Sequence, residues 1–170
     1  SLDQSPTNYI NLSIPGHSEY IAIQSNGNKT FFLDDSNTPV FWNYDNLKWK
    51  SSFDDPLPAP GCEKLNEPLI TKRSFGYQID YDLLNLIYLM LSRVEELKSN
   101  ELDQHGRFSA YSSHAYKNEY LERPIVDEWL FILSQVIQKI WPNVKLNSHK
   151  FKIKVSHDVD APSRYIFQNF

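Results

Sequence analysis

The segment from Leu83 to Leu97 places the strongest constraint on how this 170-residue chain can fold. Apolar residues recur there at helical spacing, and additional leucines widen the stripe until it nearly encircles the helix: Leu83, Leu84, Leu86, Ile87, Leu89, Met90, Leu91, Val94 and Leu97. A helix that is apolar on most of its sides is buried on most of them. We therefore expect this helix, capped at its N-terminus by Asp80, to be central to a packed domain.

A second long helix is predicted between Pro124 and Pro142. Proline suits the first helical turn, and Asp127 and Glu128 follow where the helix dipole favours acidic side chains. The residues expected to face the core are Trp129, Ile132, Leu133, Val136, Ile137 and Ile140. Two long buried helices are thus expected within a helical part that spans residues 80–141.

The first third of the chain, residues 1–53, is predicted to be rich in β-structure. Residues 19–25 alternate in polarity, Asn26-Gly27 follows, and residues 29–33 are again β-prone, which is the pattern of a β-hairpin. The proline-rich residues 54–68 are expected to form an extended loop between the β-rich and helical parts.

A last strand is predicted near the end of the chain, where Phe151, Ile153 and Val155 alternate with two lysines. This alternation is typical of a strand that is buried on one face only. Strands, two helices and a final strand together indicate an α/β or α+β fold that begins with a β-hairpin region.

Charge and cysteine content exclude several function classes. The net charge is −4 and the pI about 5.7, so no electrostatic basis exists for binding nucleic acid or an anionic membrane. The longest apolar run falls far short of the roughly 20 residues that a membrane span needs. Cys62 is the sole cysteine, so the chain cannot form an internal disulfide. With no recognisable leader peptide, we expect a cytoplasmic protein.

The densest polar cluster, S-H-D-V-D-A-P, directly follows the last predicted strand. Asp158 and Asp160 are two residues apart and share a side if the extended backbone continues, with His157 next to them. Two carboxylates at a strand end can act as a metal ligand and a general base. In the alternative interpretation, Asp160 caps a helix that begins near Ser163 and the other two are ordinary loop residues.

Two further polar clusters lie earlier in the chain. They comprise a helix-end cluster, Arg93, Glu95 and Glu96, and a loop cluster, Asp103, His105 and Arg107. The loop cluster could reach an active site or bind an anionic sugar, or its ion pairs could simply hold the loop together. We interpret the helix-end cluster as a polar edge that fixes this loop, since a buried arginine–glutamate pair specifies geometry more than stability.

An aromatic group occupies residues 41–49 and includes Trp42, Tyr44 and Trp49. Such rings could form a stacking platform for a glycan. Aromatic residues at this density also pack hairpins and cores, and both interpretations remain open at this point.

The His-Asp-Val-Asp element resembles the first conserved motif of the polysaccharide deacetylase family, the NodB-homology carbohydrate esterases. Three earlier motifs resemble an uncharacterised domain that precedes the deacetylase barrel in a subset of bacterial proteins: S-R-V-E-E at residues 92–96, D-Q-H-G-R-F at residues 103–108 and R-P-I-V-D-E at residues 123–128. Their order and spacing carry the resemblance, which covers about residues 80–162.

This resemblance implies that residues 1–150 are an accessory N-terminal domain. Residues 151–170 would be the first strand and the start of a truncated catalytic domain, an irregular (β/α) barrel. By resemblance, Asp158 corresponds to the general base and Asp160 to a ligand of a divalent metal such as zinc. His157 and the two polar clusters are candidate supporting residues. The family more usually has adjacent acids, whereas Val159 separates them here.

The resemblance further implies hydrolysis of N- or O-acetyl groups on sugars, with an acetylated glycan and the remainder of the barrel as partners. In the family a His-x3-His pair completes the metal site, and none of the five histidines here has that spacing. We therefore expect this piece to be inactive alone and to hold no metal tightly. Two alternatives are a non-catalytic carbohydrate- or protein-binding module, with residues 42–49 as its face, and a scaffold that covers an edge of the barrel.

Overall fold

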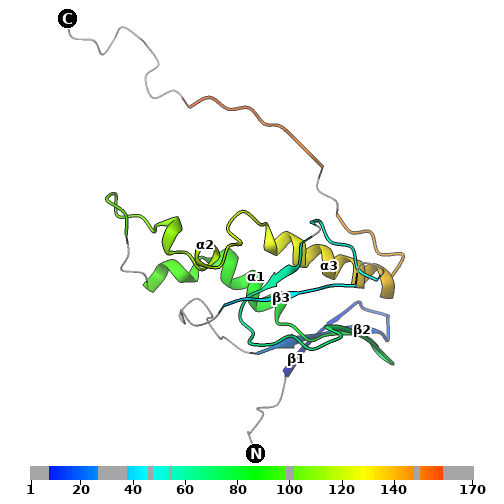
Figure 1. The fold of residues 1–170 in the computed structure, drawn as a ribbon. Helices are drawn as coiled ribbons and strands as arrows, with labels where there is room; N and C mark the ends of the chain where they lie inside the picture. Colours follow the sequence, from blue (N-terminus) through cyan, green and yellow to red (C-terminus); the bar gives the residue numbers. More distant parts are fainter. Residues whose placement is uncertain are drawn as a thin grey trace, which may run out of the picture.

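The computed structural model describes residues 8–26, 38–45, 48–53, 55–98, 102–147 and 150–158 (Figure 1). Within these residues the fold is mixed α/β of the α+β type, with one four-stranded sheet, one two-stranded sheet and three α-helices. The coarse fold class predicted from the sequence is therefore confirmed.

The four-stranded sheet has the order β1-β2-β6-β5 and comprises β1 (Asn8–Ser13), β2 (Tyr20–Ser25), β6 (Gly76–Ile79) and β5 (Ile70–Arg73). Strands β2 and β6 run parallel, whereas β1 pairs antiparallel with β2 and β5 pairs antiparallel with β6. Residues 29–33, the predicted hairpin partner of β2, lie outside the described residues. The described neighbours of β2 are β1 and β6.

The two-stranded sheet joins β3 (Val40–Trp42) to β4 (Leu57–Ala59), so the strand expected near residues 41–49 is present. The prediction of a plain loop over residues 54–68 is wrong at β4, where Leu57 and Ala59 are almost fully buried. Proline favours an extended backbone and is tolerated in short edge pairs, which explains a strand in this stretch.

The helical part begins with α1 (Leu83–Ser92), and its N-cap is Asp82 rather than the predicted Asp80. The Asp82 carboxylate accepts a hydrogen bond from the backbone N–H of Asn85 at 3.1 Å. The Asp80 carboxylate instead accepts hydrogen bonds from the Tyr9 hydroxyl at 2.8 Å and the Gln78 amide at 2.6 Å. Asp80 therefore joins β1 to β6 rather than capping the helix.

The helix predicted to reach Leu97 ends at Ser92, because Arg93 adopts a left-handed backbone with a φ of 55°. A 3-10 helix, η2 (Val94–Lys98), follows, and Leu91 and Leu97 are 70% and 80% exposed. The buried face of α1 is thus narrower than the sequence pattern indicated. A short helical region, η3 (Ala110–Ser112) and α2 (His114–Lys117), precedes α3 (Ile125–Ile140).

The core lies between the helices and one face of the four-stranded sheet. Figure 1 shows α1 and α3 on the same side of this sheet, and both helices contact its strands. Ile23, Ile79 and Ile70 face one another across β2, β6 and β5 and are buried. The predicted core stripe of α3 is confirmed at the residues that are buried: Trp129, Ile132, Leu133 and Val136.

Gly76 allows β6 to lie close to β2 and to α3. Its φ is 134°, a conformation that residues with a side chain rarely adopt. A Cβ atom at this position would collide with the backbone oxygen of Tyr20 and the Cδ1 atom of Ile140. Only glycine fits where the strand meets both neighbours.

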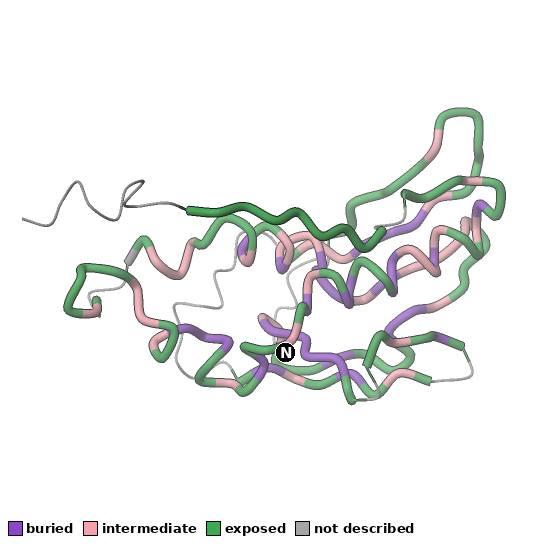
Figure 2. Tube along the Cα trace, turned by 90° about the horizontal axis from the view of Figure 1, so that it is seen from above, coloured by how far each residue is buried: buried purple, intermediate pink, exposed green. Residues whose placement is uncertain are grey.

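The C-terminal segment, residues 150–158, differs from the rest of the described chain, to which we refer as the body (residues 8–147). Figure 2 shows this segment as exposed along its whole length, and Figure 1 shows it leaving the body beyond α3. Phe151, Ile153 and Val155 are 90%, 75% and 75% exposed. The predicted half-buried strand is therefore wrong within the described residues, because the segment has no neighbouring strand there to pair with its backbone.

The described helices are all too short or too polar to cross a membrane.

Candidate functional site

The acidic motif lies on the exposed C-terminal segment. His157 and Asp158 are exposed, and neither forms a hydrogen bond or ion pair with another described residue. Asp160, the predicted metal ligand, lies outside the described residues. Within the described part of the chain, no three histidine, cysteine, aspartate or glutamate side chains lie close enough together to hold a metal ion.

The helix-end cluster connects η2 to α2. Arg93 and Glu96 form an exposed ion pair, with Nη2 and Oε2 2.8 Å apart. Glu95 instead accepts the backbone N–H of His114 at 3.0 Å, and burial raises the pKa of its carboxyl. The His114 ring in turn shares a short, buried hydrogen bond with the hydroxyl of Tyr120. This geometry gives Glu95 a positioning role within the body.

The loop cluster is held together by one carboxylate. Asp103 accepts the backbone N–H groups of His105 at 2.8 Å and Arg107 at 2.9 Å. It also forms an ion pair with the Arg107 guanidinium at 3.0 Å, and a β-bridge between Leu102 and Phe108 closes the loop. These hydrogen bonds, above all that from the Arg107 backbone, hold the pKa of Asp103 below its usual range. No hydrogen bond or ion pair among the described residues links this cluster to His157 or Asp158.

A buried ion pair between Arg123 and Glu128 was not predicted from the sequence. Its Nη2 and Oε1 atoms are 2.7 Å apart, and the side chains are 17% and 2% exposed. Arg123 also donates to the backbone oxygen of Pro56 at 2.6 Å and lies over the ring of Phe53. The pair thus fixes α3 to the residues that lead into β4. Glu128 was interpreted only as a helix-dipole residue, and a five-residue spacing gives no helical signal for a pair.

The aromatic residues of 42–49 do not form an exposed platform. Trp42 and Trp49 are 3% and 6% exposed, and Trp42 stacks on Trp129 with ring centroids 5.7 Å apart. The Tyr44 hydroxyl donates a hydrogen bond to the backbone oxygen of Phe53 at 2.7 Å. Of the two interpretations that the sequence left open, core packing is therefore the one that these rings adopt.

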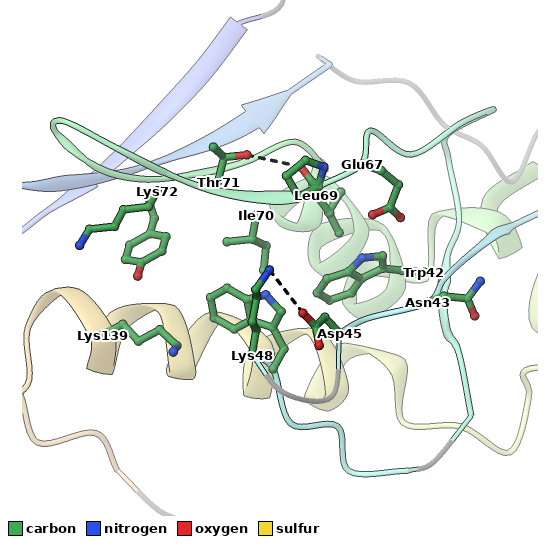
Figure 3. Close-up of a pocket in the computed structure, with 13 residues that line it drawn as sticks. Trp42, Asn43, Asp45, Lys48, Glu67, Leu69, Ile70, Thr71, Lys72 and Lys139 are labelled. Carbon is green, nitrogen blue, oxygen red and sulfur yellow. Dashed lines mark hydrogen bonds and ion pairs between the residues drawn. The ribbon is translucent and has the colours of Figure 1, made fainter.

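The two tryptophans nevertheless help to form a cavity of about 430 Å³, which we call the Trp–Lys cavity. It lies between the chain that follows β3, the loop before β5, strands β5 and β6, and α3 (Figure 3). The polar side chains around it are Asn43, Asp45, Lys48, Glu67, Thr71, Lys72, Tyr77 and Lys139. Residues distant in sequence meet here, which is why the cavity was not predicted.

Charged groups in the Trp–Lys cavity are distributed unevenly. Figure 3 places Lys72 and Lys139 at one end and Asn43 and Glu67 at the other. The Lys139 ammonium lies 5.2 Å from the centroid of the Trp49 ring, a cation–π contact. The cavity thus has two lysines at one end and an asparagine and a glutamate at the other, and the ion pair between Lys48 and Asp45 lies between the two ends.

Comparison with known proteins gives one family match. The model of DUF7033, described as a family of unknown function, matches residues 5–142. No curated protein and no solved structure shows a significant match. The matched range includes the Trp–Lys cavity, the buried ion pair and both polar clusters, and it ends before the C-terminal segment.

Proposed function

The chain belongs to the DUF7033 family, and since that family has no known function we propose one from the residues of this chain. We propose that residues 1–150 are an accessory domain of a metal-dependent polysaccharide deacetylase. Residues 151–170 are then the first strand and the beginning of its catalytic barrel, and the sole cysteine accords with a cytoplasmic location.

The main support is the exposure of the C-terminal segment. Phe151, Ile153 and Val155 recur at every second position, and each of these apolar side chains is at least 75% exposed. Monomeric proteins rarely leave such a row uncovered, so the segment fits a strand that another unit buries. It also lies outside the range that the family model matches. A boundary between two units near residue 150 is consistent with both observations.

The catalytic roles in this proposal fall on Asp158 and Asp160. A carboxylate at Asp158 accepts the proton of the water that adds to the acetyl carbonyl. Acetate is released, and the sugar keeps an amine or a hydroxyl. A divalent metal bound at such a site polarises a carbonyl oxygen. The described residues do not make up a metal site, so the proposal assigns the remaining ligands to the rest of the barrel.

The test uses the natural protein that contains this chain and measures acetate release from N- and O-acetylated oligosaccharides. Asp158→Asn and Asp160→Ala are each expected to lower the rate about 100-fold or more. Asp127→Asn, an exposed acid on α3, is the matched control and is expected to keep the rate. A chelator should abolish turnover, and added zinc should restore it.

Two results would contradict the proposal. Undiminished turnover in Asp160→Ala would remove this residue as a metal ligand. Absence of acetate release from every acetylated substrate by the unmodified, metal-loaded protein would remove the deacetylase function altogether.

A further inference from the structure

The Trp–Lys cavity has the size and the walls of a small-ligand site. Its volume of about 430 Å³ lies within the roughly 300–1,000 Å³ that is typical of such sites. Its apolar lining includes Trp42, Trp49 and Ile70. All three are buried in the body, so they close the cavity on its apolar side without offering an open ring face for stacking.

One end of the cavity is suited to an anion. Among the described residues no carboxylate pairs with Lys72 or Lys139, whereas Lys48 is paired with Asp45 at 3.3 Å. Lys139 is additionally held by its contact with Trp49. Two ammonium groups that lack a carboxylate partner favour a single negative charge between them.

The other end is suited to hydroxyl groups. Asn43 offers an amide that both donates and accepts hydrogen bonds, and Glu67 offers acceptor oxygens. A carboxylate at this end also disfavours ligands that are anionic throughout, such as polyphosphates. The ligand should therefore carry its negative charge at one end and neutral hydroxyls at the other.

We propose that the Trp–Lys cavity binds an acidic saccharide. A uronate carboxylate lies toward Lys72 and Lys139, and the neutral hydroxyls of the saccharide lie toward Asn43 and Glu67. This binding activity belongs to the body and does not depend on the proposed deacetylase chemistry.

Calorimetric titration of the chain with two disaccharides that each carry a single terminal uronate, one a glucuronate and the other a galacturonate, tests the proposal. The matched control ligand is the methyl ester of each disaccharide, which keeps the sugar rings and loses the charge. We expect saturable binding of at least one acid, about tenfold or more weaker binding of the ester, and weakening of acid binding by salt.

Substitutions of the two cavity lysines test whether the saccharide binds in the cavity. Lys72→Gln and Lys139→Gln are each expected to weaken acid binding about three- to tenfold and ester binding much less. Lys154→Gln, on the exposed C-terminal segment, removes the same charge outside the cavity and should leave affinity unchanged. Lys139 packs on Trp49, so the thermal unfolding of the Lys139→Gln variant is compared with that of the unmodified chain to check that the core is intact. Lys72 is exposed, so its variant is not expected to disturb the core.

Absence of saturable binding to both acids overturns the proposal, and so does affinity that neither cavity variant changes. Equal binding of acid and ester overturns the assignment of the lysines to a carboxylate. Asp158→Asn should leave saccharide binding intact, so the failure of this proposal and the failure of the deacetylase proposal can be told apart.

Discussion

Strand β2 and the C-terminal segment have similar sequence patterns and opposite environments. Large apolar residues recur at every second position in both, in Y-I-A-I-Q-S of β2 and in F-K-I-K-V of the segment, although Ala22 between the two isoleucines of β2 is also apolar and buried. Ile21 and Ile23 are 0% and 1% exposed, whereas Ile153 is 75% exposed. Strand β2 has hydrogen-bonded neighbours on both sides, and the segment has none among the described residues.

The difference teaches that a two-residue period identifies side chains that share a face but does not supply the partner that buries them. Strand β1 illustrates the converse. Its sequence, N-Y-I-N-L-S, has little alternation and all six of its residues are exposed. It is nevertheless a strand, because the free edge of β2 offers backbone hydrogen bonds along its whole length.

The largest expected change in the free energy of unfolding comes from a buried ion pair, because charged side chains are buried in the body and exposed on the segment. Glu128→Ala leaves the Arg123 guanidinium without its buried partner and should lower the free energy of unfolding by about 3–5 kcal/mol. Its exposed neighbour is the control, since Asp127→Ala should cost at most about 1 kcal/mol. Urea unfolding measures both. Similar losses of unfolding free energy in the two variants would show that the buried ion pair stabilises the body no more than an exposed acid does.

A matched pair of isoleucine substitutions tests the comparison directly. Ile23→Ala creates a cavity beside Ile79 and should cost about 3 kcal/mol. Ile153→Ala removes the same atoms from an exposed side chain and should change the free energy of unfolding by less than about 0.5 kcal/mol. A large loss for Ile153→Ala would break the comparison, because it would mean that the segment packs against the body in solution.

Two glycines with positive φ provide a sharper test of close packing in the body. Gly76→Ala combines an unfavourable backbone conformation with collisions at β2 and α3, and should cost about 2 kcal/mol or more. Gly16 also has a positive φ, of 86°, but nothing lies within 4 Å of an added Cβ. Gly16→Ala should therefore cost only about 1 kcal/mol. Equal unfolding midpoints for the two variants would refute the close approach of β6 to β2.

Much of the helical part could be predicted because its signals are local. Pro124 and the apolar stripe define α3 correctly, since a helix presents residues three and four apart to the same neighbour. The start of α1 was misjudged by two residues because Asp80 and Asp82 both have capping side chains. Asp82 is the cap because the Asp80 carboxylate accepts hydrogen bonds from Tyr9 and Gln78 of the sheet instead.

The candidate sites were less predictable because their residues come from distant parts of the chain. The Trp–Lys cavity joins Trp49 to Lys72 and Lys139, and no spacing in the sequence indicates that these residues meet. The loop cluster is the exception. Asp103 and Arg107 are four residues apart around Gly106, so their contact follows from local loop geometry.

The smallest predicted effect lies in that loop. The pKa of Asp103 is held below its usual range, mainly because the backbone N–H of Arg107 donates to the carboxylate. The ionised form is therefore favoured by the folded loop, so its stabilising contribution is present above the unfolded-state pKa and is lost as the pH falls through the folded-state pKa. NMR titration of the Asp103 carboxyl carbon measures its folded-state pKa directly.

Arg107→Gln separates the two contributions to the pKa of Asp103. The variant removes the exposed guanidinium but keeps the backbone N–H, so the pKa should rise only slightly and stay below its usual range. A rise to the ordinary value would mean that the ion pair, and not the backbone, organises the loop. In that case the contact would depend on two exposed side chains that salt can screen, and the loop would resemble the C-terminal segment more than the body.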